Sequence, residues 1–181
     1  MESDAMRTIN GQTDTSQGST PKQATCKDRV HAHYTCRINE LRALWHAYTH
    51  TGEMCQECKG TGKVGKYDCG YCDAGKYPDE GARLCEYGLS FDYVAPGTFR
   101  DQRRGYWRYQ LSWGGPGDEF RFYADENKQL TRIEYWFLDW LDGAKVRVQP
   151  TSRNGRLLGE LWELFKDGGT VDSVYNTAMA D

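Results

Sequence analysis

Between residues 28 and 49, hydrophobic side chains recur every three or four positions, which is the spacing of one face of an α-helix. Gly52 follows the last of them and is well placed to end the helix. The pattern predicts an amphipathic helix within residues 25–54, with its apolar stripe packed on the rest of the protein. The stripe consists of Val30, Tyr34, Ile38, Leu41, Trp45 and Tyr48.

After residue 88 the pattern changes to an alternation of apolar and polar residues, which is typical of half-buried β-strands. Trp107, Tyr109, Leu111 and Trp113 fall on one predicted face, and Arg108, Gln110 and Ser112 fall on the other. We therefore expect an antiparallel meander of four or five strands. The strand segments are 106–113, 120–124, 130–138 and 145–148, with 89–94 as the candidate fifth, and turns are expected at 114–117, 125–128 and Asp142-Gly143.

The last apolar stripe, in residues 156–167, has helical spacing and ends at Gly168-Gly169. It consists of Leu157, Leu158, Leu161, Leu164 and Phe165, and such a helix is suited to cover the sheet. The fold class is therefore predicted as α+β. The expected organisation is a flexible polar tail (1–24), a helix (25–54), a cysteine-rich finger (55–78) and a sheet-plus-helix module (79–181).

The most specific motif is a pair of Cys-x-x-Cys knuckles. Cys55 and Cys58 form the first knuckle, and Cys69 and Cys72 form the second. Four thiolates at this separation can surround one zinc ion tetrahedrally. The segment 55–75 contains almost no aliphatic side chain, so a bound metal would have to supply its stability. Two disulfides or a redox Cys-x-x-Cys are the alternatives.

This stretch resembles the cysteine-rich zinc finger of the DnaJ (Hsp40) chaperones, whose repeat is Cys-x-x-Cys-x-Gly-x-Gly. Residues 55–62 match that repeat fully, whereas the second knuckle has Ala74 and Lys76 at the glycine positions and Gly75 between them. The family uses four repeats and two zincs, and this chain has two repeats and no His-Pro-Asp tripeptide. The resemblance implies a one-zinc site, with a DnaJ-like chaperone accessory as one alternative function.

Residues 106–177 resemble a small module of uncharacterised phage and mobile-element proteins, through Leu-Ser-Trp-Gly-Gly-Pro at 111–116 and Tyr-Trp-Phe-Leu-Asp-Trp-Leu-Asp-Gly-Ala at 135–144. This resemblance implies a phage-encoded factor that blocks a host protein. The sharper form of that expectation is an anti-CRISPR or anti-restriction inhibitor of a host defence complex.

Several other side chains are candidates for chemistry. His46 and His50 are four residues apart on the predicted helix, and Cys26 and Cys36 flank two further histidines, so either pair could contribute to a second metal site. Cys85 is expected to be a half-buried free thiol. Asp139 and Asp142, with Glu134 on the same strand, could form an acid cluster, although solvated turn carboxylates are the simpler interpretation. Arg100, Arg103 and Arg104 form a basic loop interrupted by Asp101, for which a solvated loop is the simpler interpretation.

The composition favours a binding protein over an enzyme. The chain has 181 residues, a formal net charge of −3 and 13% aromatic residues, and large rings and arginines dominate the energetics of protein interfaces. Neither half is strongly basic, which argues against high-affinity nucleic-acid binding. A zinc protein that binds nucleic acid remains an alternative, and its contacts would come from Lys59, Lys63, Lys66 and Lys76 around Tyr67, Tyr71 and Tyr77.

The expected location is the cytoplasm. The first 30 residues are polar, without the apolar stretch of a secretory signal, and no run of 18 apolar residues predicts a membrane span. Seven cysteines without such a signal suit a reducing compartment. We further expect the metal to join the N-terminal helix to the sheet as one stiff body. The partner and the oligomeric state cannot be read from the sequence.

Overall fold

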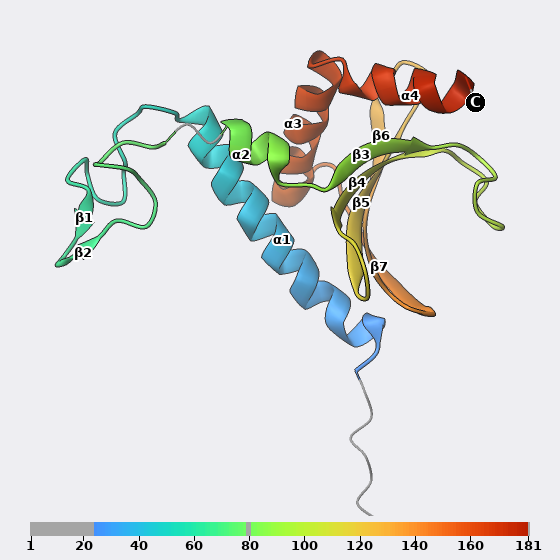
Figure 1. The fold of residues 1–181 in the computed structure, drawn as a ribbon, viewed down its shortest axis with the longest axis horizontal. Helices are drawn as coiled ribbons and strands as arrows, with labels where there is room; N and C mark the ends of the chain where they lie inside the picture. Colours follow the sequence, from blue (N-terminus) through green and yellow to red (C-terminus); the bar gives the residue numbers. More distant parts are fainter. Residues whose placement is uncertain (1–23, 79–80, 181) are drawn as a thin grey trace, which may run out of the picture.

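The computed structural model describes residues 24–78 and 81–180, so the predicted tail lies outside it except for Ala24. The predicted α+β class is confirmed: an N-terminal helix is followed by a five-stranded antiparallel sheet and two C-terminal helices (Figure 1). The elements are α1 (Cys26–Thr49), β1 (Lys63–Val64), β2 (Tyr67–Asp68), α2 (Gly81–Glu86), β3 (Ser90–Val94), β4 (Tyr106–Ser112), β5 (Gly117–Ala124), β6 (Leu130–Asp139), β7 (Asp142–Val148), α3 (Arg153–Asp167) and α4 (Thr170–Ala180).

The large sheet is a simple meander in which each strand pairs with the next, in the order β3-β4-β5-β6-β7. Its alternation matches the sequence pattern, since Trp107, Tyr109 and Leu111 are buried on the helix-covered side. Trp113 departs from the prediction. It lies beyond the end of β4 and is 77% exposed, so it does not belong to the core face.

The turn between β6 and β7 is also not where the sequence predicted it. Asp142 and Gly143 are in β7, and the turn is made by Trp140-Leu141, because Asp139 pairs with Asp142 across the hairpin. The register is set by burial, since Phe137 must face the core and pairs with Ala144 on that same face. The favourable turn dipeptide Asp-Gly is overruled by this requirement.

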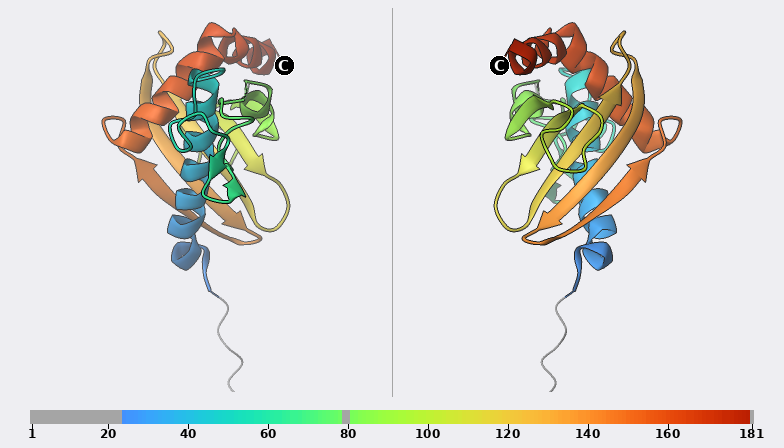
Figure 2. Two further views of the ribbon diagram at one scale, coloured as in Figure 1. Left: turned by 90° about the vertical axis from the view of Figure 1, so that its left-hand side faces the viewer. Right: turned by 90° about the vertical axis from the view of Figure 1, so that its right-hand side faces the viewer.

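The helices cover one face of the sheet, and among the residues that the structure describes the other face is crossed only by the β3–β4 loop (Figures 1 and 2). On the covered face, Trp162 of α3 is fully buried against Trp107 and Phe122, although the sequence pattern did not place it in the stripe. Residues 170–180 form α4, a helix that was not predicted from the sequence, and its Val171 is buried and accepts a hydrogen bond from Trp107 Nε1. The short helix α2 was likewise not predicted.

Polar contacts join α1 to the sheet along its length. Arg37 makes a bidentate ion pair with the buried Asp118, with Nε 2.7 Å from Oδ2 and Nη2 3.1 Å from Oδ1. Arg29 pairs with Asp139 at 2.8 Å, and the backbone N–H of Cys26 donates to Asp142. The expectation that a metal joins helix to sheet is therefore wrong, because the helix makes these contacts itself.

Candidate functional site

The four predicted metal ligands lie together in the finger that follows α1. Their sulfur atoms all lie within 4.8 Å of one another, and among the described residues they are the one group of three or more His, Cys, Asp or Glu side chains placed to hold a metal ion. The distances Cys55–Cys69 and Cys58–Cys72 are 3.9 and 3.6 Å. A tetrahedron with metal–sulfur bonds of 2.3 Å has edges of about 3.8 Å, so the geometry fits thiolate coordination of one such ion.

The backbone of the finger explains its departure from the repeat. Gly75 has φ +90° and lies so close to the first knuckle that a Cβ there would be 2.1 Å from the carbonyl oxygen of Gly60. Only glycine fits at this position. The glycine of the second knuckle therefore stands one place later than the repeat predicts because the two knuckles pack directly on each other.

One ligand is poised for ionisation. Burial acts to raise the pKa of Cys58, but the N–H of Gly62, 3.3 Å from the sulfur, and the neighbouring thiols lower it to about 6. A thiolate is the form that binds metal. The other three sulfurs surround this position, so the finger is arranged to accept a cation.

Tyr77 attaches the finger to α1. Its N–H donates to the carbonyl of Glu53, its hydroxyl accepts from the N–H of Gln56, and its ring packs edge-on against His46 at 5.0 Å. His46 stacks on His50, so the pair contacts a tyrosine and joins no metal cluster in the described chain. Tyr77 is buried and cannot stack on a base, contrary to the nucleic-acid alternative.

The other cysteines do not form a second centre. Cys26 is buried at the start of α1 and Cys36 is exposed ten residues later, about 15 Å away along a helix, which is too far for one ion. Cys85 is exposed, not half-buried as predicted. None of these three thiols lies in a metal-binding group within residues 24–78 and 81–180.

The carboxylates of the candidate acid cluster are hydrogen-bonded or ion-paired within the fold. Asp139 and Asp142 bind α1 as described above, so they are not free turn carboxylates. Glu134 accepts hydrogen bonds from Lys145 Nζ, Trp136 Nε1 and the Tyr123 hydroxyl. Burial acts to raise the pKa of Glu134, but these donors outweigh it and hold the pKa below its usual value.

Two features escaped sequence reasoning. The first is the β6–β7 turn, where Trp140 and Leu141 are 92% and 105% exposed. Trp140 lies beside the β4–β5 turn, since a Cβ on Gly115 would be 2.9 Å from its indole nitrogen. The alternation of β6 carries a signal for this turn, but it places the two residues beyond the core only when the pairing of β6 with β7 is known.

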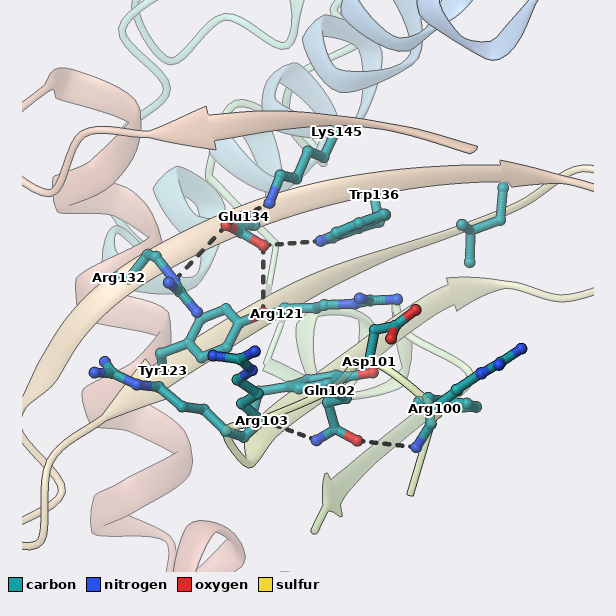
Figure 3. Close-up of a pocket in the computed structure, with 14 residues that line it drawn as sticks. Arg100, Asp101, Gln102, Arg103, Arg121, Tyr123, Arg132, Glu134, Trp136 and Lys145 are labelled. Atoms are coloured by element: carbon teal, nitrogen blue, oxygen red, sulfur yellow. Dashed lines mark hydrogen bonds and ion pairs between the residues drawn. The ribbon is translucent and has the colours of Figure 1, made fainter. Parts of the chain in front are cut away.

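The second is a cavity of about 740 Å³ on the uncovered face of the sheet, between strands β4 to β7 and the β3–β4 loop (Figure 3). The three arginines of the predicted basic loop line it and are all exposed, which agrees with a solvated loop, and the loop lies over the sheet. Its remaining charged lining side chains are Asp101, Arg121, Arg132, Glu134 and Lys145.

Comparison with protein-family models, curated proteins and solved structures found no match. The DnaJ-like and phage-like resemblances therefore rest on the quoted motifs alone. No helix in the described part of the chain combines the length and the apolar character that a membrane crossing requires.

Proposed function

We propose that the protein is a non-enzymatic, zinc-stabilised binding protein that acts by occupying a site on another protein. A zinc ion bound by four thiolates has no open coordination position, so the metal holds the finger together and does no chemistry. The candidate carboxylates pair with cations, indole and hydroxyl groups and backbone N–H, which leaves them no role as acid and base.

The observation that carries this proposal is the Trp140-Leu141 turn. A two-residue hairpin turn normally takes Asn-Gly or Asp-Gly, because the backbone needs positive φ there. Trp140 has φ +52° and almost no burial, so it gains nothing for the fold in return for the strain. Tryptophan is the residue most enriched at interface hot spots, and a strained, exposed one is best explained by a partner that covers it.

The sharper proposal follows from the phage-like motifs. The partner is a protein complex of a host defence system, and the protein inhibits it stoichiometrically. The finger offers further exposed apolar contact area on the far end of α1, through Met54, Val64, Tyr67 and Tyr71.

The test replaces Trp140-Leu141 with Asn-Gly. Asn tolerates the positive φ of position 140 and Gly can adopt any backbone conformation at position 141, so the variant should fold with a stability close to that of the original protein. Its protection of phage against restriction or CRISPR interference, measured as plating efficiency, should fall at least a hundredfold. The co-eluting complex with the defence proteins should be lost in parallel.

The matched control changes two other exposed apolar residues, Leu89→Ser with Met179→Gln, and should protect phage normally. The proposal is contradicted if the Asn-Gly variant protects as well as the original protein.

A further inference from the structure

We propose that the uncovered face of the sheet binds a single strand of nucleic acid, DNA or RNA, through its phosphates and bases. The chain as a whole is acidic, with a formal net charge of −3. The cavity on this face nevertheless has six cationic and two acidic lining side chains. A local surplus of this size attracts a polyanion although the protein's net charge does not.

Three of the cations have no competing partner within the described part of the chain. Arg100, Arg103 and Arg104 form no side-chain ion pair or hydrogen bond to another described residue, and all three are exposed on the loop above the sheet. Figure 3 shows Arg100 and Arg103 on the opposite side of the cavity from Glu134 and Lys145. Unpaired cations that converge on a concavity are available for phosphate oxygens.

At the floor of the cavity, aromatic rings hold the planar guanidinium groups of Arg121 and Arg132 in place. The guanidinium of Arg121 lies 4.7 Å from the ring centroid of Tyr106 and 4.1 Å from that of Trp136. Its Nε donates to Glu119, while its two Nη groups have no acceptor within the described residues. Arg132 lies in the same way over Tyr123, at 3.6 Å. Both planar cations can pair with phosphate, and Arg132, which lies against one ring, can also stack on a base.

An unpartnered buried hydroxyl adds an independent sign of a ligand. Tyr106 lines the cavity and is 1% exposed, and its hydroxyl has no hydrogen-bond partner in the described chain. Burial raises the pKa of this tyrosine to about 12, so it stays a neutral donor at physiological pH. A buried hydroxyl without a partner costs free energy, which a bound acceptor would recover.

The shape favours a strand over an isolated anion. A second cavity of about 820 Å³ shares Arg103, Arg104 and Tyr123 with the first, so the two adjoin and together form the groove; the other charged side chains that line the second cavity are Asp125, Glu126 and Lys128. Lys128 in the second cavity lies 3.6 Å from the ring centroid of Tyr175, which repeats the cation-on-ring arrangement, and it also pairs with Asp172 at 3.7 Å. Proteins that bind single strands combine basic side chains with stacking planes in this way, whereas a peptide of acidic residues alone, such as poly-glutamate, has no ring to stack.

The experiment measures binding of fluorescein-labelled (dT)12 and (rU)12 to the full-length zinc-loaded protein at several salt concentrations. Arg103→Gln with Arg104→Gln should weaken binding about tenfold at 0.1 M salt and make the dependence on salt shallower. The matched control, Lys63→Gln with Lys66→Gln, removes the same charge from the finger and should leave binding unchanged. The DNA and RNA probes show which strand is preferred, and either one supports the proposal.

Tyr106→Phe separates binding from folding. Removal of the unpartnered hydroxyl should leave stability equal or raise it, while binding weakens severalfold. Neither Trp140 nor Leu141 lines the groove, so the Asn-Gly variant should bind oligonucleotide normally, and failure of the proposed function would not affect this result. The proposal is overturned if neither probe binds at 50 mM salt, if only the finger variant loses binding, or if poly-glutamate competes as well as an oligonucleotide of equal charge.

Discussion

Asp118 is a buried carboxylate of β5 that pairs with Arg37 of α1. Besides the bidentate pair with Arg37, it accepts hydrogen bonds from the hydroxyls of Tyr135 and Ser112. Burial acts to raise the pKa of Asp118, but these donors outweigh it and the pKa lies below its usual value. A carboxylate with every oxygen satisfied can remain ionised inside the protein.

Asp118→Asn should lower the free energy of unfolding by about 3 kcal/mol, because Arg37 would lose its ionised partner in a partly buried position. Urea unfolding followed by tryptophan fluorescence measures the change. The matched control is Asp92→Asn, which breaks the more exposed pair with Arg108 and should cost less than about 1 kcal/mol. Equal costs for the two variants would show that burial does not govern the Arg37 pair.

At the scale of the element, the finger and the sheet are stabilised by different groups of buried residues. The finger's buried cluster consists of the four cysteines and Tyr77, whereas the core of the sheet and helices contains neither. The finger has only the two-residue strands β1 and β2. Without its metal it therefore has too little buried surface to stay ordered.

Cys58→Ser, or removal of zinc by a chelator, should unfold residues 50–78 and leave the sheet intact. Hydrogen exchange should show lost protection in the finger and retained protection in β4 to β6. Metal analysis should find about one zinc per chain in the original protein and none in the variant. A cooperative loss of the whole fold would show instead that the finger supports the sheet.

The features that could be predicted from the sequence are those that depend on local interactions. The helix α1, the meander and the cysteine knuckles could be predicted, because each depends on spacing along the chain. The groove could not, because it brings together side chains from four strands and a loop, and only the strand register places Arg121 opposite Glu134. The Trp140 turn was missed for the same reason, since local preference favoured Asp142-Gly143 and burial of Phe137 overruled it.

For the whole molecule, buried carboxylates set the response to acid. Asp118 and Glu134 both have lowered pKa values in the folded state. Such groups stabilise the fold fully above their unfolded pKa values of about 3.9 and 4.3, and the contribution is lost as pH falls through the folded values. The protein should therefore keep its stability between pH 7 and 5 and lose it progressively below pH 4.

Urea unfolding at a series of pH values tests this expectation. The Cys58→Ser background binds no zinc, so competition between protons and zinc for the thiolates no longer contributes and the response of the sheet is measured alone. Asp118→Asn on this background should flatten the decline below pH 4. An unchanged slope would assign the acid sensitivity to other carboxylates.

The length of α1 has a consequence for how a target can be engaged. Its first residues meet the β6–β7 hairpin, its last residues lead into the finger, and its 24 residues span about 36 Å (Figure 1). The helix is thus a spacer that holds two exposed apolar tips at a set separation. A small target can contact only one tip. A target that contacts both tips must therefore be a large assembly, or two subunits that are bound at the same time.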